Sequence, residues 1–358
     1  MSELEQRRSA VSASLLEHKI DAFLVSSPAN VRYLTGYAGS NGLLLLTTRE
    51  AHFFTDPRYA LEATRQVTCK VHVSKGRLMA AAAALIKRKR LKKIGFETAW
   101  MSHEDFAKLK EALPLGAGLH PIGRVLEEQR MVKSPGEIAL IRRSVQVNSE
   151  AYARTLKRVC VGGREQDVAA ELDFQMRMLG AESTAFETIV AAGERSALPH
   201  ARPSVYRLEE NELLLIDMGA TLDGYCSDMT RVAYAGTPPR RVRAMYRAVL
   251  EAQLAGIDAV RPGITAGKVD RVVRGVLKLH NLDKQFTHST GHGLGLEIHE
   301  PPRLGKKDKT RLQAGMTITI EPGVYIEGVG GIRIEDTVLV TESGCEVLTP
   351  TAKEFASL

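Results

Sequence analysis

The chain has 358 residues, of which 44% are hydrophobic and 25% charged, so it is long enough for two domains with cores of their own and is not a disordered chain. The net charge is +7 and the densest basic run is KRKRLKK at 87–93; such a run after a helical stretch is typical of a solvated helix end, and no RNA-binding or zinc-finger signature accompanies it, so no nucleic-acid partner is predicted. No run approaches the roughly 18 apolar residues of a membrane span and the N-terminal segment is polar, so we predict a cytoplasmic protein without a membrane partner.

The first third of the chain alternates strand-like and helical segments. Strand-like runs lie at 22–25, 43–48, 52–55, 69–74 and 93–96, and a helical stretch lies at 102–113. This alternation predicts an α/β domain that ends near residue 125. Residues 126–358 are then left for a second domain.

A strong helix start follows this boundary. Ser134 is suited to the N-cap, Pro135 to the first helical position and Glu137 to the capping-box position. The helix is expected to run to about residue 159.

The remaining elements occur twice in the same order. A long helix at about 135–159, a glycine turn, a second helix at about 165–179 and two strands come first. About a hundred residues later come a long helix at 240–260, a second helix at 265–280 and further strands. The order indicates a duplicated unit, whose two halves would meet around one central site.

The first half carries two carboxylates in LLLIDMGATLDGYCSDMTR at 213–231, which has the pattern of a hairpin with a two-residue turn at Asp223-Gly224. Counting outward from the turn pairs Asp217 with Thr230 and places Asp228 on the same face as Asp217. A single aspartate that ends an apolar strand is more often a loop residue. Two aspartates on one face of a hairpin, however, can bind the same ligand.

The second half carries two more carboxylates in GMTITIEPGVYIEGVGGIRIEDT at 315–337. The alternation of apolar and polar residues places Glu321 at the end of one strand and Glu335 on the same face of another as Arg333. Four clustered carboxylates repel one another in a low-dielectric site, and the nearby Arg231 and Arg333 are too few to balance them. Two divalent cations, with a charge of about +4, would leave four carboxylates and a bridging hydroxide, about −5, nearly neutral.

The stretch HSTGHGLGLEIHE at 288–300 supplies a nitrogen ligand. A neutral imidazole of His292 can complete the metal shell, and the three glycines let the backbone come close to the ions. His299 is then free to act near the ions, while His288 is either a structural group or one that orients a ligand, and the two glutamates of the stretch are either solvated or orienting acids. An oxygen-rich set with one nitrogen favours manganese or cobalt, with zinc or iron possible.

Four motifs, in the order IDMGATLDGYCSDMTR, STGHGLGLEIHE, TITIEPGVYIEG and GGIRIEDT, resemble those of the pita-bread metallopeptidases, in particular the aminopeptidase P and prolidase branch. The segments VRYLTGYAGSNGLLLLTT and FFTDPRYALEA are similar to the creatinase-like N-terminal domain of these enzymes. The resemblance covers nearly the whole chain. It implies an α/β (α+β) fold, with a creatinase-like N-terminal domain at 1–125 and a pseudo-two-fold pita-bread catalytic domain at 126–358, and it implies a homodimer.

The resemblance also implies a set of metal ligands for two divalent ions. These ligands would be Asp217, Asp228, His292, Glu321 and Glu335. Asp217 would bind one ion, Asp228 and Glu335 would bridge both, and the remaining two would complete the shell of the other.

Four further residues match substrate-site positions of the family. His200, in SALPHARPS, would line the substrate site, and His299 would help to stabilise the tetrahedral intermediate. Arg303 falls where dipeptidase-type members hold the carboxylate of the proline. Arg333 would be a catalytic-site arginine beside the last metal ligand.

The implied function is hydrolysis of the bond between an N-terminal residue and a following proline. Glu321 would act as base or proton shuttle, while His299 and His200 would steady the oxyanion or orient the substrate. The Xaa-Pro bond is a tertiary amide without an N–H and calls for a dedicated pocket. Three alternatives remain open: a dipeptidase against an aminopeptidase acting on longer peptides, a methionine-aminopeptidase-like specificity, and a non-catalytic peptide- or protein-binding member of the fold.

Overall fold

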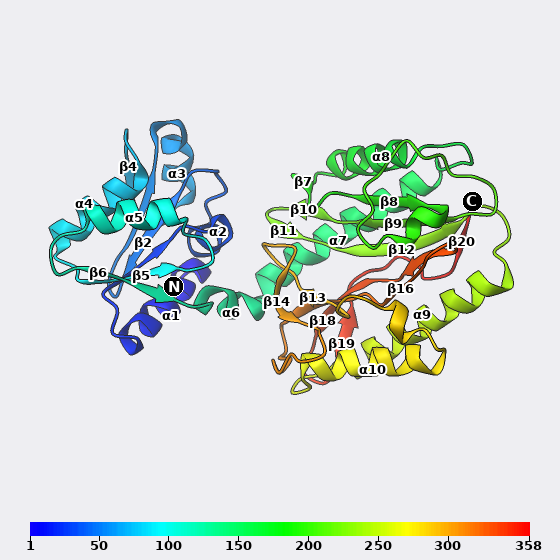
Figure 1. The fold of residues 1–358 in the computed structure, drawn as a ribbon. Coiled ribbons are helices and arrows are strands. Elements are labelled where there is room, and N and C mark those ends of the chain that lie inside the picture. Colours follow the sequence, from blue (N-terminus) through cyan, green and yellow to red (C-terminus); the bar gives the residue numbers. More distant parts are fainter. The chain divides into compact units, whose positions relative to one another are not determined.

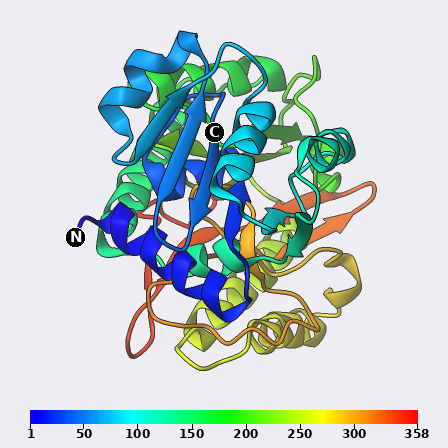
Figure 2. The same ribbon diagram turned by 90° about the vertical axis from the view of Figure 1, so that its left-hand side faces the viewer.

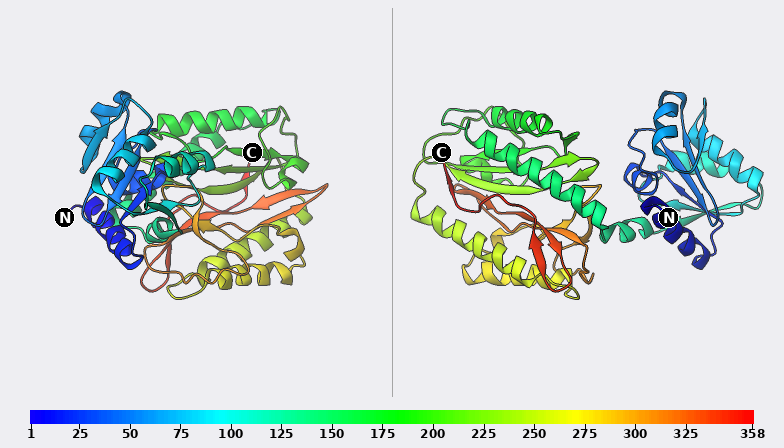
Figure 3. Two further views of the ribbon diagram at one scale, coloured as in Figure 1. Left: turned by 60° about the vertical axis from the view of Figure 1, so that its left-hand side comes forward. Right: turned by 180° about the vertical axis from the view of Figure 1, so that it is seen from behind.

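The computed structural model describes residues 1–358, apart from the side chain of Ser357. The backbone divides into two compact units, Met1–Arg130 (unit 1) and Met131–Leu358 (unit 2) (Figures 1 and 3). Among the described residues, no helix has both the length and the apolar character that a membrane crossing requires.

Unit 1 is built on a six-stranded mixed sheet in the order β4-β3-β2-β1-β5-β6. Figure 2 shows this unit, in blue to cyan, facing the viewer. The strands are β1 Ala22–Val25, β2 Leu43–Thr47, β3 Ala51–Thr55, β4 Lys70–Val73, β5 Lys93–Glu97 and β6 Gly118–Ile122. The helices are α1 Glu3–Glu17, α2 Pro28–Thr35, α3 Ala60–Gln66, α4 Leu78–Lys89, α5 His103–Ala112 and α6 Val125–Met131, which continues into unit 2. The central strands β1 and β2 are buried at every position and apolar except at Thr47, because both faces of the sheet are covered.

The first half of unit 2 begins at the helix start that the sequence predicts. The Ser134 hydroxyl accepts a hydrogen bond from the Glu137 amide, and the Glu137 carboxylate accepts one from the Ser134 amide. The elements are α7 Pro135–Leu156, α8 Glu165–Met178, β7 Ser183–Thr184, β8 Ile189–Ala192, β9 Leu213–Met218, β10 Ala220–Leu222, β11 Tyr225–Cys226 and β12 Met229–Tyr234. Strands β8, β9 and β12 form one sheet with β20 Ala356–Ser357.

The second half of unit 2 repeats the pattern of two helices followed by strands. Its elements are α9 Arg240–Ala259, α10 Ala266–Leu279, β13 His292–Gly293, β14 Glu300–Arg303, β15 Thr317–Ile320, β16 Gly323–Ile326, β17 Gly330–Arg333, β18 Asp336–Val340 and β19 Cys345–Val347. The five-stranded sheet has the order β14-β13-β15-β18-β19, and β16 and β17 form a separate hairpin. Short 3-10 turns lie at Pro57–Tyr59, Gly193–Ala197 and Asp283–Gln285. The predicted α/β (α+β) class and the duplicated arrangement are confirmed.

Alternation along β9 explains how unit 2 forms layers. Leu214 and Ile216 pack in the core cluster that includes residues of α7 and α8, whereas Leu213 and Leu215 pack in the cluster that includes residues of α9 and α10. In Figure 1 the sheet accordingly lies between these two helix pairs. Asp217, two residues beyond Leu215, shares the face that is turned toward the second half.

Candidate metal centre

The five predicted ligands come from both halves of unit 2. Asp217 lies in β9 opposite Thr230 of β12, in the register that the hairpin pattern predicts, and Asp228 directly precedes β12. His292 opens β13, Glu321 directly follows β15, and Glu335 lies between β17 and β18. The first half therefore contributes two carboxylates, and the second half contributes two carboxylates and the imidazole.

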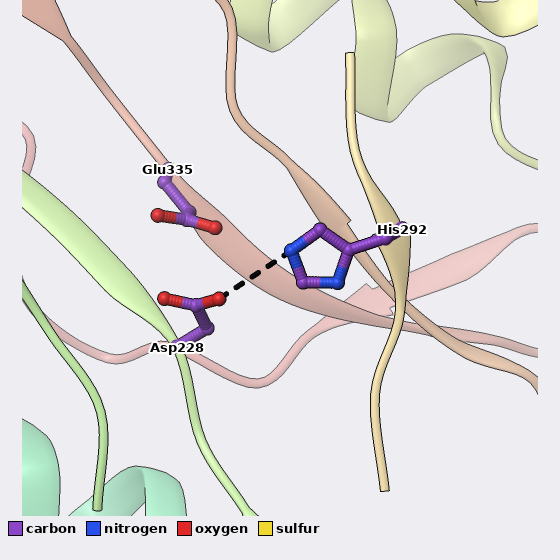
Figure 4. Close-up of side chains that lie close together, drawn as sticks. All are labelled: Asp228, His292 and Glu335. Carbon is purple, nitrogen blue, oxygen red and sulfur yellow. Dashed lines mark ion pairs between the residues drawn. The ribbon is translucent and has the colours of Figure 1, made fainter. Parts of the chain in front are cut away.

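Three of these side chains form a compact group (Figure 4). Asp228, His292 and Glu335 each offer one ligand atom, and these atoms lie within 4.8 Å of one another. The Nε2 atom of His292 is 3.6 Å from Asp228 Oδ2 and 3.4 Å from Glu321 Oε1. The imidazole thus faces carboxylates from both halves at once.

The four carboxylates, Asp217, Asp228, Glu321 and Glu335, form an acidic cluster whose charge is poorly balanced. Burial and the neighbouring carboxylates raise the pKa of Asp228 and of Glu335 well above their usual values. Burial raises the pKa of Glu321 to about 7, against the lowering effect of the nearby Arg333. Such a cluster must bind protons or cations to be stable.

One atom of the acidic cluster indicates that the cluster binds a cation rather than protons alone. Oδ1 of Asp217 is buried and, among the described residues, has no hydrogen-bond partner. The other oxygen of the same carboxylate, Oδ2, accepts a 2.6 Å hydrogen bond from Nη2 of Arg333. A buried acceptor without a donor, next to other carboxylates and an imidazole nitrogen, fits a divalent cation. The residues present therefore suit a metal site.

Local contacts orient His292 for this role. Its Nδ1 lies 3.0 Å from the carbonyl oxygen of Gly293, which can only accept, so Nδ1 carries the proton and Nε2 presents its lone pair to the acidic cluster. A Cβ at Gly291 would overlap the backbone carbonyl oxygen of Thr319. Glycine is required there because the chain before His292 passes so close to the strand that leads to Glu321.

Arg333 and Thr230 hold two carboxylates of the acidic cluster in place by hydrogen bonds. Arg333 donates from Nη2 to Asp217 and from Nε to the Thr230 hydroxyl at 3.0 Å, and this hydroxyl donates to Glu335 Oε2 at 2.7 Å. One arginine and one threonine thus orient a carboxylate from each half of unit 2.

Tyr325 extends this network and was not identified from the sequence. Its hydroxyl accepts from Arg333 Nη1 at 2.6 Å and lies 2.9 Å from His288 Nε2, while burial raises the pKa of Tyr325 to about 12. Burial lowers the pKa of His288 to about 3, so this ring is neutral. The signal that would have found Tyr325 is the β16–β17 register, in which Gly323 lies opposite Arg333 and Tyr325 is therefore a diagonal neighbour of that arginine.

The three predicted substrate-side residues differ in their placement. The ring of His299 packs edge-on against His292 with centroids 4.4 Å apart. The residue is exposed, and partial desolvation lowers its pKa to about 4. Arg303 is exposed and lies opposite His292 in the β13–β14 register. His200 is exposed, in the loop whose Pro199 carbonyl oxygen accepts a 3.3 Å hydrogen bond from Arg333. All three are exposed, whereas the metal-ligand candidates are buried or half-buried.

A buried ion pair supports the loop that ends in His299. Lys133 Nζ lies 3.1 Å from Glu300 Oε2, with the two side chains 1% and 2% exposed. The other carboxylate oxygen of Glu300 accepts a hydrogen bond from the backbone N–H of Glu297 at 3.2 Å. Glu300 is therefore an orienting acid rather than a solvated one.

Comparison with known families matches both units. Residues 139–342 match the family model of metallopeptidase family M24, and residues 7–132 match that of the creatinase/prolidase N-terminal domain. The resemblance drawn from the sequence motifs is thereby confirmed.

Individual relatives match over nearly the full length. The chain is 36% identical over 339 residues to a Xaa-Pro dipeptidase of Pyrococcus furiosus, covering 95% of this chain and 96% of the relative. Among solved structures, a Xaa-Pro dipeptidase from Bacillus anthracis matches with a TM-score of 0.96 and 35% identity over 99% of this chain and 100% of that one. A Thermotoga maritima structure described as an X-Pro aminopeptidase matches with a TM-score of 0.91 and 34% identity, over 97% of this chain and 100% of that one.

Proposed function

The chain belongs to metallopeptidase family M24, and from this membership we propose that it is a Xaa-Pro peptidase that cleaves the bond between an N-terminal residue and a following proline. The observation that carries the proposal is the buried acidic cluster with His292 at its edge, whose charge requires cations. Metal-dependent peptide hydrolysis, the chemistry of a metallopeptidase family, requires a cation-binding site of this kind.

We further propose that the site holds two divalent cations, manganese or cobalt in preference to zinc or iron. The ligands would be Asp217, Asp228, His292, Glu321 and Glu335. The oxygen-rich donor set with a single nitrogen supports the choice of metal. When bound, two divalent cations lower the pKa of a water molecule and polarise a carbonyl group.

The protein's own groups would then handle the proton and the substrate. Glu321 would take the proton of the attacking water and pass it to the leaving proline nitrogen. His299, neutral because its pKa lies at about 4, would donate a hydrogen bond to the developing oxyanion. His200, on the exposed loop, would orient the substrate, and Arg333 would keep Asp217 in place.

The exposed Arg303 favours a dipeptidase over an enzyme for longer peptides. It lies across the strand pair from His292 and, being exposed, can receive an anionic group. In a dipeptide the proline carries a free carboxylate, which an arginine can bind in bidentate fashion. In a longer peptide this carboxylate is absent, so the same arginine would contribute little.

Hydrolysis of Ala-Pro and Ala-Pro-Ala by chelator-treated protein, with and without added Mn²⁺ or Co²⁺, tests the proposal. Asp228→Asn should abolish metal-dependent cleavage, whereas the matched Asp223→Asn, on the exposed turn of the same hairpin, should retain it. Arg303→Ala should reduce kcat/KM for Ala-Pro by about tenfold or more and leave Ala-Pro-Ala nearly unchanged. Cleavage of neither peptide with any metal would reject the Xaa-Pro assignment in favour of another specificity or a non-catalytic member.

A further inference from the structure

The net positive charge of the chain lies entirely in unit 1. Residues 1–130 contain 20 lysines and arginines and 13 aspartates and glutamates, whereas residues 131–358 contain 29 of each kind. The excess of +7 therefore belongs to a unit that contributes none of the candidate metal ligands. A charge of this size can attract anions by long-range electrostatics.

Part of this charge lines a groove of about 800 Å³, which we call the basic groove. It lies where the chain leaves α1 and α4 and where β2 turns into β3. Its cationic side chains are Lys19, Arg49, Lys89, Arg90 and Lys92. Two acids, Asp21 and Glu50, also line it, so its formal charge is +3. Its volume falls within the range of about 300–1,000 Å³ that small-molecule sites occupy.

Both acids of the basic groove are already engaged by the protein. Glu50 forms ion pairs with Lys89 and with Lys70, the latter at 2.5 Å. Asp21 Oδ2 accepts hydrogen bonds from the backbone N–H groups of Lys92 and Lys93 at 2.7 and 2.9 Å. Asp21 keeps its negative charge, so the groove retains its net formal charge of +3.

Four cations of the basic groove are exposed and, within the described chain, form no ion pair: Lys19, Arg49, Arg90 and Lys92. Lys19 and Arg90 have φ angles of 54° and 57° next to helix ends, where glycine would be less costly. The helix dipole favours a cation at such an end, which accounts for these two. It does not account for Arg49, in the β2–β3 turn, or Lys92, between α4 and β5.

We propose that the basic groove binds a small polyphosphate anion. Arginine pairs with phosphate oxygens through two N–H groups, and lysine supplies a point charge, so four unpaired cations around one groove suit a chain of phosphates. The wall also carries Leu91 and the 65% exposed Leu16, which offer an apolar surface to a nucleoside. The phosphate chain of a nucleotide and inorganic polyphosphate share this chemistry.

Isothermal titration calorimetry of the full chain with ATP and with tripolyphosphate tests the proposal. The protein is first treated with a chelator, so that neither ligand binds through metal ions, and the salt concentration is 150 mM. We expect one-to-one binding that weakens at least about tenfold in Arg49→Glu/Lys92→Glu. The control Arg65→Glu/Lys75→Glu changes the net charge equally at exposed positions of unit 1 outside the groove, and should weaken binding less than about twofold because salt screens distant charges.

The remaining measurements distinguish a nucleotide from inorganic polyphosphate as the ligand. They also define the results that overturn the proposal. Tighter binding of ATP than of tripolyphosphate, with the difference lost in Leu16→Ser, indicates a nucleotide; equal binding indicates the inorganic chain. Absence of binding, or equal weakening in the two charge variants, overturns the proposal. A single-stranded DNA oligonucleotide that binds at least tenfold more tightly than ATP would reassign the groove to nucleic acid. Far-UV circular dichroism and Ala-Pro hydrolysis should be unchanged in both charge variants.

Discussion

Lys133→Met should lower the free energy of unfolding of unit 2 by about 3–5 kcal/mol, because it leaves the Glu300 carboxylate buried without its ammonium partner. The size of the effect follows from burial, since the two side chains are 1% and 2% exposed. An exposed ion pair contributes at most about 1 kcal/mol. Arg142→Met is the matched control, because its pair with Glu346 has side chains 38% and 47% exposed.

A second substitution separates the ion pair from simple loss of packing. Glu300→Gln removes the charge but retains a side-chain oxygen that can accept from the Glu297 amide. The double variant Lys133→Met/Glu300→Gln should therefore cost less than about 2 kcal/mol. The two changes would then be non-additive by at least about 1 kcal/mol, as expected for residues in direct contact.

The assay must report on unit 2. Urea unfolding followed by far-UV circular dichroism gives the free energy, and hydrogen exchange of the segment 292–304 gives the local effect. The single tryptophan, Trp100, lies in unit 1, so its fluorescence serves as an independent signal. If Lys133→Met lowers the free energy of unfolding no more than Arg142→Met does, the Lys133–Glu300 pair is hydrated and the prediction is wrong.

Three further predictions follow from the same structure. Gly291→Ala should abolish peptidase activity and destabilise unit 2 by about 1–3 kcal/mol or more, because the added methyl overlaps backbone, whereas Gly305→Ala, whose added methyl has its nearest neighbour at 3.8 Å, should resemble the parent in both assays. Chelator-treated protein should lose stability as the pH rises through about 7, since Glu321 and its neighbours have folded-state pKa values above those of the unfolded chain, and added Mn²⁺ should remove this pH dependence in thermal melts. Burial lowers the pKa of His52 and of His72, so the unfolded chain binds protons more readily than the folded chain does below a pH of about 6.5. The stability of unit 1 should therefore fall as the pH drops below this value. The double variant His52→Gln/His72→Gln should show a flatter dependence of stability on pH when unfolding is followed by tryptophan fluorescence.

Local patterns in the sequence were sufficient for the main elements and the acidic strands. The two-residue turn at Asp223-Gly224 determines by counting alone that Asp217 lies opposite Thr230, and the structure has this register. The capping box at Ser134 likewise marks the start of α7. By contrast, β6 (GLHPI) has neither an apolar run nor a clear alternation, and its proline cannot donate to the sheet, so no strand was predicted there.

Contacts between distant segments were beyond the reach of these patterns. Lys133 and Glu300 are 167 positions apart, and a lysine beside a helix start is ordinarily solvated, so nothing in its neighbours indicates a buried partner. The link from Tyr325 to Arg333 depends on how β16 pairs with β17, and the orphaned oxygen of Asp217 depends on the packing of two half-domains. Such features arise from tertiary structure and not from local propensity.

The division of the candidate ligands between the two halves of unit 2 has a consequence during synthesis on the ribosome. A nascent chain has made Asp217 and Asp228 long before Glu321 and Glu335 exist, so a partial product presents at most an incomplete set of ligands. Sites of this kind bind metal only as the final structure forms, and the binding free energy then stabilises the finished protein. A nascent chain would thus acquire its hydrolytic capacity only after both halves of unit 2 have been made and have folded together.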